Sequence, residues 1–264
     1  MVDAELVVSV NNNVMTLTIN RPEKRNAMSV EVINNLKEAL ISAKVDNDVR
    51  VVVITGQGDK AFCSGADLSG GMMDQPKEQT LIDQHNARGQ LAEIFNLMYE
   101  LGKPTVARVN GYAMAGGFGL ALACDIVIAA AHSKFGATEV NVGLWPFMIS
   151  VPLSRSMPPK KALELMMTGR KVSAQEGAEI GFVNSVVEFD GLDNAVNEVT
   201  SRMASLPPAA IKLGRTMFYA TLNMEPHQAL GYLQTGLSLT TLTEDAREGV
   251  LAFLEKRPPN FTGS

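Results

Sequence analysis

The chain has 264 residues, enough for a sizeable hydrophobic core in one large domain or one domain with a small appendage. With 46% hydrophobic and 19% charged residues, its composition is that of an ordinary globular protein, which excludes the disordered and fibrous classes. The formal net charge of −5 argues against a surface devoted to neutralising the phosphates of a nucleic acid.

Cysteine usage and hydropathy indicate the cellular compartment of the protein. Cys63 and Cys124 each stand among apolar or small residues, which favours free buried thiols in a reducing compartment over a disulfide or a zinc cluster. The first residues carry acids and no basic segment followed by an apolar core, so no targeting signal is visible. The nearly uncharged run at 109–131 contains Asp125 and clustered glycines, which favours core over a membrane span. We expect a cytoplasmic protein with no membrane partner and no metal.

The first 55 residues predict a hairpin, a helix and a buried strand. Two short β-rich runs, at 6–10 and 14–19, flank three asparagines that suit a turn. Ser29 can cap a helix over 30–45, in which apolar residues recur at helical spacing. Residues 49–55 contain an unbroken valine and isoleucine run, typical of a strand covered on both faces in a parallel sheet.

The middle of the chain repeats a pattern of strand, turn of small residues and helix. Residues 60–68 (K-A-F-C-S-G-A-D-L) indicate a strand followed by a turn, and 81–101 regain helical spacing. The intervening loop at about 69–77 is predicted to be mobile, either as an adaptable methionine-containing lid or as a connection without a role. Residues 105–109 then predict a strand that leads into N-G-Y-A-M-A-G-G at 110–117 and a helix.

The glycine-rich turn around Gly116 has two interpretations. Small residues let a ligand approach the main chain, and the first N–H groups of a helix lack internal partners and lie at its positive end. The turn could therefore hold a developing negative charge, or its glycines could merely permit close helix packing. The residues of this turn alone leave both interpretations open.

The rest of the chain predicts buried strands, short helices and a helical end. The predicted elements are a strand at 126–130, helices at 158–169 and 173–181, and a short strand at 183–187. Beyond these only helices are predicted, with new ones starting near Pro207 and Pro226. Residues 1–191 therefore predict an α/β layout with crossover connections. Residues 192–264 predict an appended helical region whose leucines serve internal packing or an oligomer interface.

Several common chemistries lack their motifs. The segment A-G-G-F-G does not have the G-x-G-x-x-G spacing of a dinucleotide fingerprint, and neither G-x-x-x-x-G-K-[ST] nor G-x-S-x-G occurs. The three histidines show no pairing with a serine by motif, which disfavours a Ser-His hydrolase. Cys63 stands beside a turn of small residues, but a core position is a better account of it than a nucleophile.

After these exclusions, the candidate catalytic features are two turns of small residues and one acidic residue. Backbone N–H groups near Ala66 and Gly116 can converge on one carbonyl oxygen and stabilise an enolate or a tetrahedral oxyanion, each donor typically contributing about 3–4 kcal/mol. Glu139 stands near Trp145 and Phe147, and an apolar setting raises a carboxyl pKa toward neutrality, as a proton carrier needs. Taken alone, Glu139 would be interpreted as an exposed or salt-bridged acid; the two turns favour a catalytic interpretation.

Six ordered segments resemble the enoyl-CoA hydratase/isomerase (crotonase) superfamily over almost the whole chain. They are N-R-P-E-K-R-N-A-M-S (20–29), F-C-S-G-A-D-L (62–68), N-G-Y-A-M-A-G-G (110–117), C-D-I (124–126), F-G-A-T-E-V-N-V-G-L (135–144) and F-L-E-K-R-P (253–258). The resemblance implies an α/β spiral of repeated ββα units at 1–191 and a C-terminal helical region at 192–264 that assembles homotrimers or hexamers. It also implies an acyl-CoA thioester as substrate, so coenzyme A is part of the substrate and no separate cofactor is expected.

The resemblance also assigns roles to residues. The backbone N–H groups of Ala66 and Gly116 are expected to be the oxyanion-hole donors, with Glu139 as the acid/base. The residues expected to lie along CoA and the thioester are Arg25, Asn26, Ala27, Ser64, Gly65, Asp67, Leu68 and Gly117. Trp145 and Phe147 are expected to line an apolar acyl pocket. Phe253 and Lys256 fall where the terminal helix of the family contacts CoA.

One position departs from the hydratases of the family, which carry two glutamates that position and deprotonate water. Glu139 matches the second glutamate, whereas the first maps onto Gly119, which has no side chain. A missing general acid/base costs roughly two to four orders of magnitude in rate. A single carboxylate suffices to isomerise a 3-enoyl-CoA to a 2-enoyl-CoA in fatty acid metabolism, with Glu139 moving a proton from C2 to C4. This isomerisation is the favoured prediction.

Other functions stay open. The chain could hydrate a 2-enoyl-CoA, with a bound water in the space beside Gly119, or catalyse another crotonase reaction such as decarboxylation or a retro-aldol step. It could also be a non-catalytic CoA-binding scaffold, although the retained Glu139 argues against this. RNA binding receives little support from the charge of −5.

Overall fold

The chain folds into a spiral of strand–strand–helix units, described for residues 4–67 and 80–264 of a computed structural model. The large sheet has the spatial order β1 (Leu6–Asn11), β2 (Val14–Ile19), β3 (Val51–Gly56), β5 (Thr105–Val109), β7 (Ile126–Ala130) and β10 (Ser185–Val187). The small sheet has the order β4 (Ala61–Cys63), β6 (Tyr112–Met114), β8 (Lys134–Gly136) and β9 (Val172–Ser173). Successive turns of the spiral add one strand to the large sheet and the next to the small sheet. The predicted α/β spiral of ββα units is therefore confirmed.

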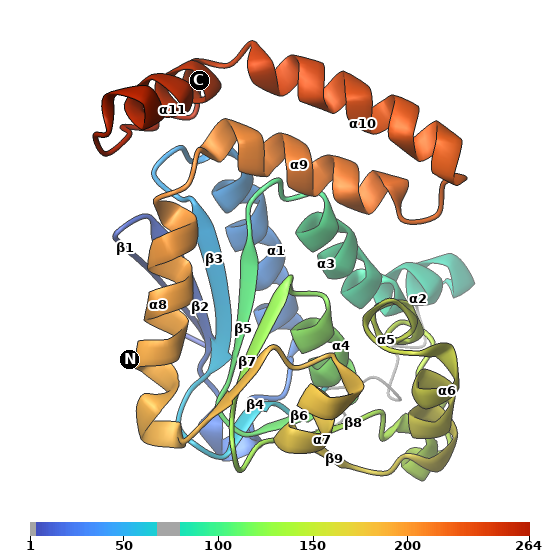
Figure 1. Cartoon of the computed structure of the whole chain (residues 1–264). Helices are drawn as coiled ribbons and strands as arrows, with labels where there is room; N and C mark the ends of the chain where they lie inside the picture. The colour runs from blue at the N-terminus through green and yellow to red at the C-terminus, as the bar shows by residue number, and fades with distance from the viewer. Residues whose placement is uncertain (1–3, 68–79) are drawn as a thin grey trace.

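Helices connect these strands and form the end of the chain (Figure 1). Those up to residue 180 are α1 (Val30–Val45), α2 (Leu81–Arg88), α3 (Gln90–Tyr99), α4 (Gly116–Leu122), α5 (Ser150–Ser156), α6 (Pro159–Thr168) and α7 (Ala174–Ile180). The later helices are α8 (Leu192–Ala204), α9 (Pro208–Thr221), α10 (Pro226–Thr241) and α11 (Glu244–Glu255). Short 3₁₀ helices occupy Pro22–Lys24, Glu139–Val142 and Phe189–Gly191. In the described ranges, no helix is long and apolar enough to cross a membrane.

Strand β3 is buried over its whole length, as its unbroken apolar run predicts. Successive side chains of a strand point to opposite faces of the sheet. Val52 and Ile54 accordingly belong to the main core, which also holds residues of α1, α3, α4 and the small sheet. Val51 and Val53 pack instead with Leu192 at the start of α8, which covers the opposite face of the large sheet (Figure 1).

The single helix predicted over 81–101 is wrong, because the chain forms α2 and α3 there. Thr80 caps α2: its hydroxyl accepts a hydrogen bond from the N–H of Asp83 (3.2 Å), and the Asp83 carboxylate accepts one from the N–H of Thr80 (3.0 Å). Gly89 ends this helix, and its N–H donates to the carbonyl of Asn86, three residues earlier (3.0 Å). Glycine is a poor helix former, so the helical ladder breaks here.

Several short elements were not predicted. The small-sheet strands β6, β8 and β9 and helix α5 have two, three or seven residues, too few for a hydrophobic period to be recognised. The run at 109–131 forms α4 and the neighbouring strands, and every residue of α4 is buried. Its interpretation as core is therefore confirmed. The loop predicted at about 69–77, and Leu68, lie outside the described residues.

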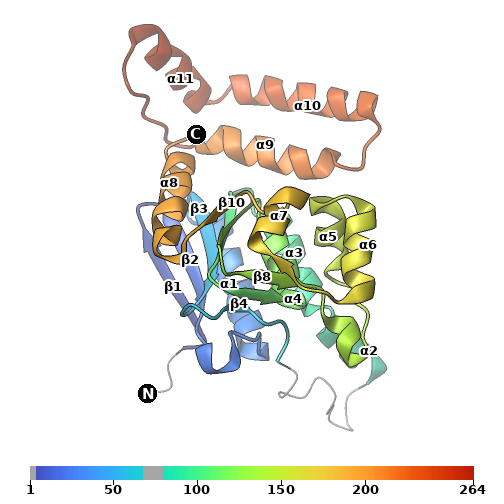
Figure 2. The ribbon, with the colours of Figure 1, turned by 60° about the horizontal axis from the view of Figure 1, so that its bottom comes forward.

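Helix α9 is attached to the core by a charged cluster around Asp125. The Arg215 guanidinium donates to Asp125 Oδ2 at 2.8 Å and to the carbonyl of Met98 at 2.7 Å, and the Tyr219 hydroxyl donates to Asp125 Oδ1. Helices α9, α10 and α11 lie beyond the sheets in both views, whereas α8 packs on the large sheet (Figures 1 and 2). The boundary between residues 191 and 192 stays a prediction.

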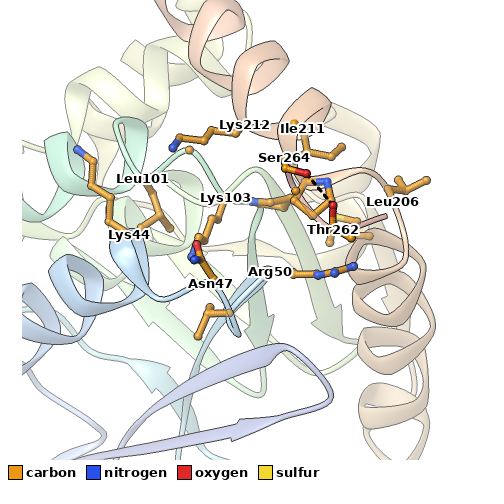
Figure 3. A pocket seen from close by; sticks show the side chains of 17 residues that line it. Lys44, Asn47, Arg50, Leu101, Lys103, Leu206, Ile211, Lys212, Thr262 and Ser264 are labelled. Atoms are coloured by element: carbon orange, nitrogen blue, oxygen red, sulfur yellow. Dashed lines mark hydrogen bonds between the residues drawn. The ribbon is translucent and has the colours of Figure 1, made fainter. Parts of the chain in front are cut away.

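A second junction between the C-terminal helices and the core surrounds a cavity of about 300 Å³ (Figure 3). Lysine and arginine side chains line it, but two of them, Arg50 and Lys103, donate their hydrogen bonds to backbone carbonyls. Arg50 donates to the carbonyls of Ala204 (3.0 Å) and Phe261 (2.9 Å). Lys103 donates to the carbonyls of Ala43 and Asp46, at the end of α1. We therefore interpret this cavity as part of the packing between the core and the C-terminal helices, and not as a ligand site.

Candidate active site

The turn after β4 is held in place by the segment that precedes α1. The N–H of Met28 donates to the carbonyl of Gly65 (2.8 Å), and the N–H of Asp67 donates to the carbonyl of Met28 (2.9 Å). These two hydrogen bonds do not use the N–H of Ala66, which lies between Gly65 and Asp67. Within the described ranges, the N–H of Ala66 has no acceptor, so it is available to a ligand.

The second turn, before α4, depends on an unusual conformation of Ala115. Its φ of 50° and ψ of −127° are sparsely populated for a residue with a side chain. The N–H of Ala115 donates to the carbonyl of Gly136 in β8 (2.8 Å), and its carbonyl accepts from the N–H of Phe118 (2.9 Å). Gly116 is consequently the first residue of α4, and its N–H has no acceptor in the part of the chain that the structure describes.

The two turns touch each other through Gly65. A Cβ atom on this residue would lie 3.0 Å from the Cβ of Ala115 and 3.4 Å from the nitrogen of Gly116. The φ of Gly65 is +99°, which also favours glycine. Two N–H groups without acceptors, Ala66 and Gly116, thus belong to adjacent turns. Such a pair can stabilise the oxyanion of a thioester enolate.

Both turns open onto one cavity of about 590 Å³. Its described lining comprises Ser64, Ala66, Arg88, Leu91, Ala115, Gly116, Thr138, Glu139, Val142 and residues 144–149. Trp145 and Phe147 contribute to its mostly apolar wall, where an acyl pocket is predicted. Their contact with an acyl chain stays a prediction. An apolar pocket with a few polar groups is typical of small-molecule sites.

Glu139 brings a carboxyl group into this cavity from the 3₁₀ helix that follows β8. Its Oε2 atom is buried and has no hydrogen-bond partner among the described residues. Burial raises the pKa of Glu139, and the one influence that lowers it is a hydrogen bond of its own backbone. A carboxyl in this environment exchanges protons closer to neutrality than an exposed glutamate does, as an acid/base group requires.

The space beside Gly119 is filled by protein. A Cβ atom on residue 119 would lie 2.8 Å from the Cβ of Ile149 and 2.9 Å from the Cζ of Phe95, and closer still to the Cγ2 of Ile149. Ile149 is 1% exposed and belongs to the main core. The expectation that a bound water could stand in this space is therefore wrong. Glu139 supplies the one carboxylate in the described lining of the cavity.

Several predicted substrate-binding residues take part in building the turns and their surroundings. The Asn26 amide is buried and donates to two backbone carbonyls at 2.6 and 3.0 Å. The Asp67 carboxylate accepts from Arg21 at 2.8 Å. Gly117 packs so closely on Cys63 that a Cβ atom would lie 2.7 Å from the Cβ of that cysteine. Contacts between these residues and CoA stay predictions.

The other predicted residues differ in position. Ser64 lines the cavity, Arg25 is exposed and Ala27 is buried. Phe253, 82% exposed, and Lys256 stand at the end of α11, which lies far from β4 in both views (Figures 1 and 2). The terminal helix of the chain thus does not bring these two residues to the chain's own cavity, because α11 follows α9 and α10 away from the sheets.

Sequence reasoning missed two residues that shape the cavity, Arg88 and Ile149. Arg88 is an exposed arginine at the end of α2, and nothing in the sequence distinguishes it from a solvated surface charge. Ile149 precedes the unpredicted helix α5, and its contact with Gly119 joins distant parts of the chain. Among residues 4–67 and 80–264, no three His, Cys, Asp or Glu side chains are placed to hold a metal ion.

Comparison with known proteins gives concordant results. The family model "Enoyl-CoA hydratase/isomerase" matches residues 9–264. The (E)-benzylidenesuccinyl-CoA hydratase of Thauera aromatica is 33% identical and covers 98% of this chain and 99% of its own. The crotonyl-CoA hydratase of Syntrophomonas wolfei is also 33% identical and covers 97% of both chains. A crystal structure of an enoyl-CoA hydratase from Mycobacterium smegmatis has a TM-score of 0.91 at 33% identity, and the match covers 97% of this chain and 98% of that one.

Proposed function

The chain belongs to the enoyl-CoA hydratase/isomerase family, and from this premise we propose that it isomerises 3-enoyl-CoA to 2-enoyl-CoA thioesters with Glu139 as its single acid/base. The observation that carries the proposal is the filled space beside Gly119. Ile149 and Phe95 leave no room there for the first atom of a second catalytic side chain. A one-carboxylate reaction therefore suits the cavity better than water addition by a pair of glutamates.

The proposed reaction needs no group beyond those in the cavity. The thioester oxygen accepts hydrogen bonds from the N–H groups of Ala66 and Gly116, each typically contributing about 3–4 kcal/mol to stabilising the oxyanion. The Glu139 carboxylate removes a proton from C2, and the electrons of that C–H bond form a dienolate. The same carboxyl then delivers the proton to C4, which moves the double bond from C3=C4 to C2=C3 and regenerates the carboxylate. Atoms and charge balance without a co-reactant.

Hydration of a 2-enoyl-CoA is the second candidate, because relatives with 33% identity carry the name hydratase. This reaction must place and deprotonate a water molecule at C3. Glu139 could remove that proton, but a water held by one carboxylate instead of two is less well oriented. The expected hydration rate is lower than that of a two-glutamate enzyme by roughly two to four orders of magnitude.

The two candidates are separated by assaying purified protein with 3-hexenoyl-CoA and with crotonyl-CoA. We expect 2-hexenoyl-CoA from the first substrate and only slow hydration of the second, with Glu139→Gln greatly reducing both rates. In D₂O, the product should retain part of the original C2 hydrogen at C4, because a buried carboxyl exchanges slowly with solvent. Rapid hydration of crotonyl-CoA without any isomerisation would establish the second candidate instead.

We propose that the protein assembles as a homotrimer or a dimer of trimers through its C-terminal helices. Leu230, Leu237 and Leu242 in or just after α10 are exposed, which a partner surface would explain. In such an assembly, Phe253 and Lys256 would reach the cavity of a neighbouring copy, since α11, which carries them at its end, lies far from β4 of its own chain (Figures 1 and 2). Light scattering gives the mass that tests this assembly.

We propose that the enzyme works in a reducing compartment such as the cytoplasm. Cys63 and Cys124 are both free and buried, which suits thiols that stay reduced. The net charge of −5 supports the expectation of no nucleic-acid partner.

A further inference from the structure

The described lining of the catalytic cavity contains two ionisable side chains, Glu139 and Arg88. The proposed reaction gives a role to Glu139 and none to Arg88. The remaining described lining consists of apolar side chains, small residues and the hydroxyls of Ser64 and Thr138. A lone arginine on an otherwise mostly apolar wall is a candidate determinant of which acyl chain is accepted.

Arg88 and Glu139 do not neutralise each other. The pKa of Glu139 is raised by burial, and no cation among the described residues counters this effect. A guanidinium beside the carboxylate would lower that pKa. In agreement with this, no ion pair joins Arg88 to Glu139 among the described residues. In the described ranges, Arg88 also has no ion pair with any other carboxylate, and its side chain is exposed.

Leu91 connects the oxyanion turn with the part of the cavity wall that Arg88 lines. Leu91, near the start of α3, packs on the oxyanion turn: its Cδ2 would lie 3.2 Å from a Cβ atom on Gly116. Arg88 is the last residue of α2, Leu91 lies at the start of α3, and both line the cavity. An acyl chain whose thioester lies at Gly116 can thus pass Leu91 and approach the guanidinium.

Resting on the proposed binding of acyl-CoA, we propose that Arg88 binds a second carboxylate, at the far end of the acyl chain. The preferred substrates would then be CoA monothioesters of dicarboxylic acids. A guanidinium can bind a carboxylate through two parallel charged hydrogen bonds, which fixes the orientation of the chain as well as its charge. An uncharged acyl chain of the same length would cover the Arg88 guanidinium without offering it a hydrogen-bond acceptor. Burial of such an unpaired charge opposes binding. Arg88 would therefore favour the anionic chain and disfavour the neutral one.

Calorimetric titration tests this proposal with two unreactive ligands of equal carbon number, adipoyl-CoA and hexanoyl-CoA. For the unaltered protein we expect adipoyl-CoA to bind about ten-fold more tightly or better, as one charged hydrogen-bonded pair provides. Arg88→Met should remove this preference by weakening adipoyl-CoA alone. Arg202→Met is the matched control, because Arg202 is another exposed arginine in the last turn of a helix, outside this cavity. It should leave the preference unchanged.

Two results would overturn the proposal while leaving acyl-CoA binding intact. One is equal affinity of the unaltered protein for both ligands. The other is a similar loss of affinity in Arg88→Met for adipoyl-CoA, hexanoyl-CoA and free CoA, which would assign Arg88 to the CoA moiety. If neither thioester bound, the proposed function would fail together with this inference. A preserved preference for adipoyl-CoA without isomerase activity would support the inference and reject only the proposed reaction.

Discussion

Ile149 occupies the volume that a side chain on residue 119 would need. Its Cβ lies 2.8 Å from the position that a Cβ atom on Gly119 would take, and Phe95 closes the same space from another side. Because both neighbours belong to the main core, this volume cannot be vacated by a change of an exposed rotamer. The glycine at 119 and the isoleucine at 149 therefore form a matched pair.

The first prediction concerns this pair. Gly119→Glu should destabilise the protein by about 3 kcal/mol or more, because it overpacks the core and buries a charge. Ile149→Ala alone should cost about 2–5 kcal/mol by leaving a cavity. In the double variant the new side chain fills that cavity, so the total loss should be smaller than the sum by at least about 1 kcal/mol. Chemical denaturation measures the four stabilities, and strictly additive losses would refute the pairing.

The second prediction concerns catalysis by Glu139. Replacement by glutamine should lower kcat/KM by roughly two to four orders of magnitude while leaving CoA affinity nearly unchanged. In the unaltered enzyme, activity should rise with pH as the carboxyl ionises, with a midpoint above the ordinary glutamate value of 4.5 because burial raises the pKa. A pH profile of kcat/KM checks both points. A midpoint at or below the ordinary value would contradict the described environment of the carboxyl.

The third prediction concerns stability and pH. Below the pKa of an unfolded glutamate, Glu139 is protonated in both states and its ionisation has no effect on folding. As pH rises toward neutrality, the unfolded chain ionises more readily than the folded one, so Glu139 lowers stability. Glu139→Gln should therefore gain stability relative to the unaltered protein between about pH 4 and pH 7. Unfolding free energies at the two pH values test this, and a pH-independent difference between the two proteins would count against it.

The fourth prediction compares two glycines in helices. A Cβ atom on Gly117 would lie 2.7 Å from the carbonyl carbon of Cys63, and backbone cannot easily move away. Gly117→Ala should thus cost about 2–3 kcal/mol or more and disturb the adjacent donor of Gly116. Gly214 in α9 is the control, since a Cβ atom there meets nothing within 4 Å. Gly214→Ala should stabilise by up to about 1 kcal/mol through helix propensity. Thermal unfolding with activity assays distinguishes the two variants.

The sequence predicted the parts of the fold whose signals are local. Long apolar runs identified the central strands of the large sheet, and small residues identified both turns of the candidate oxyanion hole. The small sheet escaped because strands such as β8 and β9 are too short to show a period. The contact between Gly119 and Ile149 escaped because it depends on the spiral winding that brings distant segments together. Arg88 escaped because an exposed arginine on a helix has no distinguishing neighbours in sequence.

The cavity is assembled from segments of two kinds, and this division has an evolutionary consequence. The proposed thioester site comes from two separate turns, at 64–66 and 115–116, that touch each other through Gly65. The proposed proton carrier, Glu139, and much of the apolar wall come instead from one uninterrupted stretch, residues 138–149. Substitutions within that single stretch can change the proposed proton carrier and the neighbouring acyl wall together without altering the two turns. The reaction can thus change in this architecture through substitutions in residues 138–149 alone.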